Sequence, residues 1–255
     1  SLTEKTCRPL VVGILGAALC LPGLGATYTG GDCSAANLIH RWSFNGDFAD
    51  SVGNLDATGV GTSFADNAVH TTGGGKSVSY VSLDPAVLPK DRPFTIEIFA
   101  TPKKIYSWSR IFSFGKGEAN SDHLDNFFMS WTRTTNQNQD EVRFRYKDGT
   151  NAIFADDSLQ PFTVGTKWHI VLAYTPNVNG DGKGRFYWSK TDLHGGSHRE
   201  SSATTVMAVD FSTWGMDGFY LGRSYWSQDL DADADYDEVR IWDVAFTPEQ
   251  TLWSA

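Results

Sequence analysis

The residues of this chain best suited to chemistry are the five aspartates that occupy alternate positions from Asp229 to Asp237. In an extended segment their carboxylates would lie on one face and repel one another, so water or a cation must separate them. Calcium prefers six to eight oxygen ligands from carboxylates and carbonyls. A second loop, from Asn45 to Asp56, is also rich in such oxygens. The acids therefore predict either a calcium site or a solvated acidic surface.

Aromatic residues suggest a second kind of chemistry, which is the stacking of rings on sugar faces. Trp131 lies near the end of a predicted strand, and Tyr225 and Trp226 follow Arg223 just before the acids. We predict that Trp131, Arg223, Tyr225 and Trp226 contact a ligand. Packing in the core or at its edge is the alternative for each ring, because tryptophan is heavily buried in most proteins.

The elements that must position these residues have the two-residue period of β-strands. In Phe94–Ala100 every second residue is apolar, and Glu141–Lys147 alternates in the same way. Val239 and Ile241 fall on one face of a late strand, together with Asp237. Thr247, Pro248 and Gln250 then suit the cap, the first position and the third position of a helix. About a dozen short strands, with no long helical segment, predict two packed antiparallel sheets.

Several motifs together carry a family resemblance that extends from Leu38 to the C-terminal end. LGRSYW, followed by an acidic loop and DEVRIWDVAFTPEQ, resembles the C-terminal end of a laminin-G-like domain of the concanavalin A-like lectin/glucanase superfamily. IHRWSFNGDFADSVGNLDAT resembles its first strand and loop, and FTIEIFATP and KWHIVLAYTP resemble its middle strands. The resemblance implies an all-β, two-sheet antiparallel jelly-roll sandwich. It does not imply one function, because the superfamily contains lectins, adhesive modules, hydrolases and lyases.

The resemblance also narrows the calcium prediction. In similar proteins the first and last strands lie side by side, which would bring the two acidic loops together. We therefore predict one structural Ca²⁺ held by Asp50, Asp235 and Asp237. In the alternative, Asp237 is hydrogen-bonded to backbone amides and the acids are solvated.

Enzymatic alternatives have weaker support. Related β-glucanases carry a Glu-x-Asp-x-Glu strand, and no Glu-x-Asp occurs anywhere in this sequence. A polysaccharide lyase needs an arginine beside a uronate, with tyrosine or histidine as base and acid. Arg143, Arg145, Tyr146 and His169 are the candidates, but Tyr146 lies on the strand face opposite the two arginines.

Composition and the N-terminal segment indicate an exported protein. Two basic residues, an apolar run and a small-residue region within residues 1–26 predict a signal peptide, followed by a lead-in at 27–37 and the domain at 38–255. The apolar run is too short to predict a membrane span, and we expect no membrane span in the mature chain. Cys33 is then the one cysteine after the signal. A formal charge of −9 argues against nucleic acid as a partner, because phosphate recognition requires a basic surface.

These observations together favour a secreted or cell-envelope module that binds or adheres without catalysis, with a carbohydrate or another extracellular molecule as its partner. A lyase or glycoside hydrolase on the same fold is one alternative. A structural subunit of an extracellular surface assembly, in which the apolar N-terminal segment is retained, is another.

Overall fold

A computed structural model describes residues 35–116, 125–132, 140–145, 151–157, 161–177, 180, 183–200, 205–207 and 210–253. The predicted signal peptide and Cys33 lie outside these residues. The described part is almost entirely β-structure, with one short α-helix, α1 (Pro248–Trp253). Three turns of 3-10 helix complete it, at Ala35–Asn37, Pro85–Val87 and Phe211–Thr213.

Nine strands form the first sheet. They are β1 (Leu38–Trp42), β3 (Thr62–Ala65), β4 (Ala68–Thr72), β6 (Phe94–Lys104), β11 (Trp168–Thr175), β12 (Gly184–Asp192), β13 (His198–Glu200), β14 (Thr205–Met207) and β16 (Asp233–Trp242). Their main order is β13-β12-β11-β6-β16-β4-β3, with β1 paired to β16 and β14 paired to β12.

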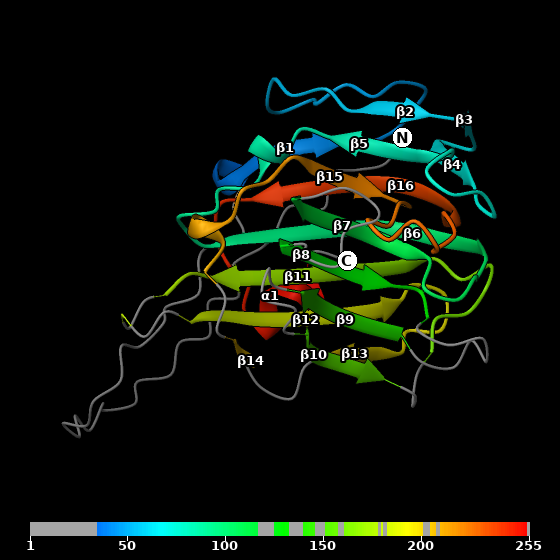
Figure 1. Ribbon diagram of the computed structural model, residues 1–255. Coiled ribbons are helices and arrows are strands. Elements are labelled where there is room, and N and C mark those ends of the chain that lie inside the picture. The colour runs from blue at the N-terminus through cyan, green and yellow to red at the C-terminus, as the bar shows by residue number, and fades with distance from the viewer. Residues whose placement is uncertain are drawn as a thin grey trace.

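Seven strands form the second sheet. They are β2 (Thr58–Val60), β5 (Tyr80–Leu83), β7 (Arg110–Lys116), β8 (Asp125–Ser130), β9 (Asp140–Arg145), β10 (Asn151–Asp157) and β15 (Gly218–Leu221). Their order is β10-β9-β8-β7-β15-β5-β2. All pairings between these strands are antiparallel, so the predicted two-sheet jelly-roll sandwich is confirmed (Figure 1).

The first and last described strands are neighbours, as the resemblance implied. β1 runs antiparallel to β16, with Leu38 opposite Trp242 and Trp42 opposite Val239. β6 pairs with the other edge of β16 along its whole length, and β4 pairs with the start of β16 on the same edge as β1. The final strand therefore occupies the middle of the larger sheet.

The main core lies between the two sheets and is dominated by aromatic rings. Phe114 and Phe127 stack at 5.1 Å, and Phe211 meets both rings edge-on. Trp42 and Trp168 are buried in this core. Each buried large side chain of this kind removes enough apolar surface from water to contribute about 1.5–3 kcal/mol.

A smaller apolar cluster covers the outer side of the nine-stranded sheet near α1. It contains Trp242 and Phe246, whose rings lie 5.1 Å apart, together with Val171 and Tyr187. The helix begins as predicted. The backbone N–H of Thr247 donates to Gln250 Oε1, and the backbone N–H of Gln250 donates to Thr247 Oγ1, which is a capping box.

The acidic segment differs from its prediction in two ways. Asp233 and Asp235 belong to β16 itself and not to a loop before it. A register shift between Tyr236 and Glu238 inserts an extra residue. Tyr236 therefore joins Val239 in the core, and Asp237 falls on the outer face. The predicted inward position of Asp237 is wrong because simple alternation does not account for a bulge.

Candidate functional site

The outer face of the seven-stranded sheet carries a row of aromatic rings. Tyr80 in β5, Phe128 in β8 and Tyr220 in β15 each lie next to residues that point into the core. Because successive side chains of a strand point to opposite faces, these three rings project away from the core. Tyr80 and Tyr220 meet edge-on at 5.5 Å.

A loop at 222–231 folds across this face and is fixed to it by buried hydrogen bonds. The Tyr225 hydroxyl donates to the carbonyl of Gly218 at 2.8 Å, and Ser113 Oγ donates to the carbonyl of Arg223 at 2.7 Å. Tyr225 is only 2% exposed, and burial raises the pKa of its hydroxyl. Tyr225 therefore anchors the loop and offers no ring face to a ligand.

Arg223 projects from this loop onto the tyrosines. Its guanidinium carbon lies 4.4 Å from the centre of the Tyr220 ring and 4.9 Å from that of Tyr80, which is cation–π geometry. Its Nε donates to Ser77 Oγ at 3.1 Å. Burial raises the pKa of the Tyr220 hydroxyl, although the charge of Arg223 acts in the opposite direction. Arg223 itself is half-buried.

Arg110, at the start of β7, has a similar but more deeply buried position. Its guanidinium carbon lies 3.8 Å from the centre of the Phe128 ring and 5.3 Å from that of Trp226. Its Nη2 is 2.6 Å from Oδ2 of Asp229. Ser224 Oγ donates to the same carboxylate oxygen, so Asp229 links the arginine to the loop.

Each arginine is held by a residue with an unusual backbone conformation. Ser77, which accepts from Arg223, has a φ of 57°, and Trp108, whose carbonyl accepts from Arg110, has a φ of 63°. Non-glycine residues rarely adopt this left-handed region, and such strain concentrates at functional sites. At Ser77 the strain is offset by Asp231, whose buried carboxylate accepts from three successive backbone amides, including that of Ser77.

We call the combined surface the aromatic–arginine face. It comprises seven residues: Tyr80, Trp108, Arg110, Phe128, Tyr220, Arg223 and Trp226. Trp108, Trp226, Tyr80 and Tyr220 all retain partial exposure. These four rings are therefore partly accessible, while hydrogen bonds fix the loop to the sheet beneath them.

Two of the four predicted ligand contacts, Arg223 and Trp226, lie on this face. The prediction is wrong for Trp131, which is 1% exposed and packs edge-on against Phe162 at 4.9 Å. The inward alternation of β8 continues past the end of the strand, and this draws Trp131 into the core. Tyr225 is nearby but buried. Sequence reasoning missed Tyr220, although its alternation with two core residues was a usable signal.

The three predicted calcium ligands do not share a site. Asp50 lies beside β1, where its carboxylate accepts from His40 Nδ1 at 2.6 Å and from the backbone N–H of Arg41 and Gly53. Burial by itself would raise the Asp50 pKa, but the hydrogen bonds from His40 and the backbone outweigh it and lower that pKa. Asp50 is therefore satisfied by groups of the protein.

The other two acids, both in β16, contact basic side chains of neighbouring elements. Asp235 contacts His70 Nδ1 at 2.9 Å and Lys103 Nζ at 2.7 Å, and Asp237 contacts Lys167 Nζ at 2.7 Å. Burial raises the Asp237 pKa. Among the described residues, no group of three or more histidine, cysteine, aspartate or glutamate side chains is arranged to hold a metal ion. These donor sets do not fit a shared calcium, which stays an untested prediction.

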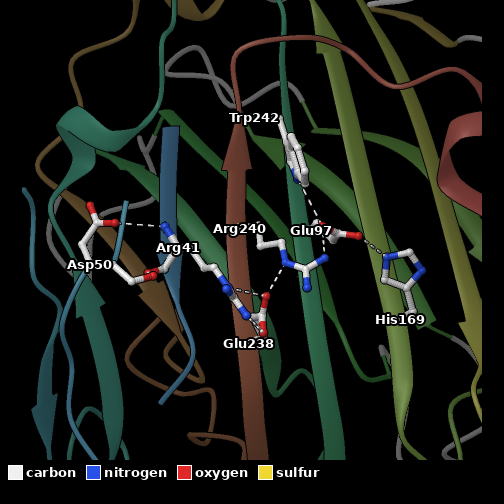
Figure 2. A network of polar contacts seen from close by, with 8 residues as sticks. Arg41, Asp50, Glu97, His169, Glu238, Arg240 and Trp242 are labelled. Carbon is white, nitrogen blue, oxygen red and sulfur yellow. Dashed lines mark hydrogen bonds and ion pairs between the residues drawn. The ribbon is translucent and has the colours of Figure 1, made fainter. Parts of the chain in front are cut away.

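A separate polar network crosses the outer face of the nine-stranded sheet (Figure 2). Glu97 in β6 accepts from His169 Nε2 at 2.7 Å, from Arg240 Nη1 at 3.2 Å and from Trp242 Nε1 at 3.1 Å. Arg240 also donates to Glu238, which accepts in turn from the guanidinium of Arg41. The network thus joins β1, β16, β6 and β11.

This network has residues suited to acid–base chemistry but lacks access. The side chains of Glu97 and His169 have no exposed surface, and Phe99 stacks on the His169 ring at 4.6 Å. A general acid or base must come within hydrogen-bond reach of the substrate. The network therefore serves to hold four strands together. The position of Glu97 on the outer strand face was predictable, but nothing in the sequence indicated that it would be covered.

The two-sheet antiparallel sandwich places the described part of the chain in the jelly-roll class of β-proteins. The family model Laminin_G_3, described as the concanavalin A-like lectin/glucanases superfamily, matches residues 74–251. The chain belongs to this superfamily. No curated protein matches the chain significantly. No helix in the described part of the chain is long and apolar enough to span a membrane.

Two solved structures share the fold at low sequence identity. Trypanosoma rangeli sialidase, in a complex with sialic acid, aligns with a TM-score of 0.59 and 16% identity over 92% of this chain and 35% of the sialidase. The enzymatically active domain of tailspike protein 2 from bacteriophage CBA120 aligns with a TM-score of 0.51 and 17% identity, over 78% of this chain and 29% of the tailspike. The chain thus spans about a third of each of these proteins.

Proposed function

We propose that this domain is an exported, non-catalytic module that binds carbohydrate at the aromatic–arginine face. The observation that carries the proposal is the pair of arginines stacked on partly exposed rings and held by strained residues. The fold does not need these arginines and rings for its core, because other rings already fill the space between the two sheets.

The chemistry of this face suits a sugar. A pyranose ring presents an apolar C–H surface that stacks on tryptophan or tyrosine, and hydroxyl groups at its edge that accept from guanidinium N–H groups. Trp226 and Tyr220 supply rings, and Arg223 supplies donors beside them. The loop is anchored through Tyr225, so little conformational entropy need be lost on binding.

The superfamily contains lectins and glucanases, so a glycan partner fits the fold that the chain shares with them. Catalysis is not part of the proposal. The Glu97–His169 pair, one of several acid–histidine pairs in the described part of the chain, is buried beneath Phe99. Export is inferred from the sequence of residues 1–26 alone.

The proposal is tested by binding to a panel of immobilised glycans, followed by calorimetry on those retained. Trp226→Ala is expected to weaken binding by at least about tenfold, as truncation of an aromatic contact does at other interfaces. The matched control is Phe64→Ala, which removes a partly exposed ring from β3 in the other sheet. Equal affinity of Trp226→Ala and wild-type protein for every retained glycan would exclude this face as the binding site.

A further inference from the structure

We infer that the glycan bound at this face carries an oxyanion, a carboxylate or a sulfate, and that Arg223 is the residue that binds it. The inference rests on the proposed function. It adds the chemical class of the glycan and the residue that contacts its charged group.

The first observation is the contrast between Arg223 and the other arginines with described networks. Arg110 is paired with Asp229, Arg41 with Glu238, and Arg240 with Glu97. For Arg223, no carboxylate of the described residues lies within ion-pair distance, and the one side-chain oxygen that its Nε meets belongs to a neutral serine. Its charge is therefore not neutralised by these parts of the protein.

The second observation is the burial of that charge. A half-buried guanidinium loses part of its hydration, and an unpaired charge in this position is unfavourable unless a partner arrives. The faces of Tyr80 and Tyr220 compensate in part through their π-systems, which attract a cation but do not neutralise it. An oxyanion that docks on Arg223 would supply the missing charge.

The third observation is the orientation of the guanidinium. Because Nε donates to Ser77 and the guanidinium lies against two rings, within hydrogen-bond reach of the Tyr220 hydroxyl, its two Nη groups form the end of a fixed fork. A planar fork of this kind matches a carboxylate or sulfate with two parallel hydrogen bonds. Ser77 keeps its left-handed conformation through Asp231, so the fork is preorganised.

The negative charge of the chain means that an acidic glycan would have to be recognised by a local site. A protein with a formal charge of −9 has no general attraction for polyanions. Binding of an acidic glycan would therefore have to come from a local site and not from a diffuse basic surface.

The experiment compares glycans that differ only in charge. The probes are oligogalacturonate and its methyl ester, dextran sulfate and its parent dextran, and the sialylated and desialylated members of the glycan panel. Wild-type protein is expected to bind one or more acidic members at least about tenfold more tightly than their neutral counterparts. That preference is expected to weaken as the salt concentration rises. The uronate, sulfate and sialate arms identify which oxyanion is preferred.

Arg223→Met is expected to remove the preference for the acidic member, and Arg223→Lys, which keeps the charge but not the fork, to retain part of it. Arg92→Met removes an exposed arginine elsewhere and is the control. Circular dichroism verifies the fold, and the lysine variant decides the result if the methionine variant does not fold.

The possible outcomes distinguish failure of this inference from failure of the proposed function. Equal binding of charged and neutral members, with loss of both in Trp226→Ala, overturns the inference and leaves the proposed function intact. An acidic preference that survives both substitutions of Arg223 also overturns it. If no glycan of the panel is retained by wild-type protein, the proposed function is wrong and the inference falls with it.

Discussion

The Nε2 atom of His169 lies 2.7 Å from Oε1 of Glu97, and neither side chain has exposed surface. The two residues belong to different strands, β11 and β6, that are neighbours in the larger sheet. A buried carboxylate must be neutralised and hydrogen-bonded, and Glu97 meets both conditions through His169, Arg240 and Trp242. This buried contact therefore helps to fix the register of β6 and β11, because water cannot reach the two side chains to replace it.

Substitution of Glu97 is expected to be among the most costly single changes in the sheet. Glu97→Ala would remove the buried acceptor that His169, Arg240 and Trp242 share, and should reduce the free energy of unfolding by about 3–5 kcal/mol. Urea denaturation measures this change. Glu249→Ala, in the exposed first turn of α1, is the control and should cost less than about 1 kcal/mol. Similar values for the two variants would show that the network does not contribute to stability.

Arg110 and Asp229 are expected to be coupled in the same way. Asp229→Ala removes a carboxylate that lies 2.6 Å from a guanidinium only 2% exposed, and a loss of about 3–5 kcal/mol is expected. Arg110→Met with Asp229→Ala removes both charges and should recover part of that loss. A double-mutant cycle by urea denaturation measures the coupling. If the two single effects simply add, the ion pair is not a stabilising element.

Asp50 should make the stability depend on acid pH. Its folded pKa is lowered below the ordinary value of 3.8, so the ionised carboxylate stabilises the folded state. This contribution is present above the unfolded pKa and is lost as the pH falls through the lower, folded pKa. The free energy of unfolding should decrease below about pH 5, and Asp50→Asn should flatten that decrease.

Denaturation at a series of pH values measures the slope for Asp50. The control is Asp91→Asn, which changes an exposed aspartate on the loop before β6 and should leave the slope as in the wild-type protein. If the free energy of unfolding of Asp50→Asn falls with pH as steeply as that of the wild-type protein, other carboxyl groups dominate acid denaturation.

Removal of calcium tests the prediction made from the acidic segment. Asp50, Asp235 and Asp237 already have partners supplied by the protein, so a chelator is expected to leave the melting temperature unchanged. A structural ion at 100 times its Kd would instead add about 2.7 kcal/mol. Thermal unfolding with a chelator and with added Ca²⁺ distinguishes these cases. A calcium-dependent rise in Tm that disappears in Asp237→Asn would restore the calcium hypothesis.

The sequence predicted most of the sandwich because alternation and capping act locally. The inward positions of Phe94, Ile96 and Ile98 follow from the two-residue period, and the helix start at Thr247 follows from its cap. Neither depends on knowledge of a distant partner. The pairing of the first and last strands came from family resemblance, because no local pattern encodes a contact between residues so far apart in the chain.

The candidate site was less accessible to sequence reasoning because it depends on contacts between loops. Whether Arg223 finds a carboxylate is decided by the path of the loop at 222–231, and whether Asp237 points inward is decided by a bulge. Trp131 was misassigned for a related reason, since the end of a strand does not end its alternation. Burial of Glu97 likewise depends on what packs above the sheet.

The central place of β16 has a consequence for biosynthesis. Until this last described strand leaves the ribosome, β6 has an unpaired edge in the middle of the larger sheet, and β1 and β4 lack the partner that connects them to it. Such edges pair readily with other chains, and contacts between remote segments form slowly. The larger sheet can therefore close only in one late step, after β16 has been synthesised.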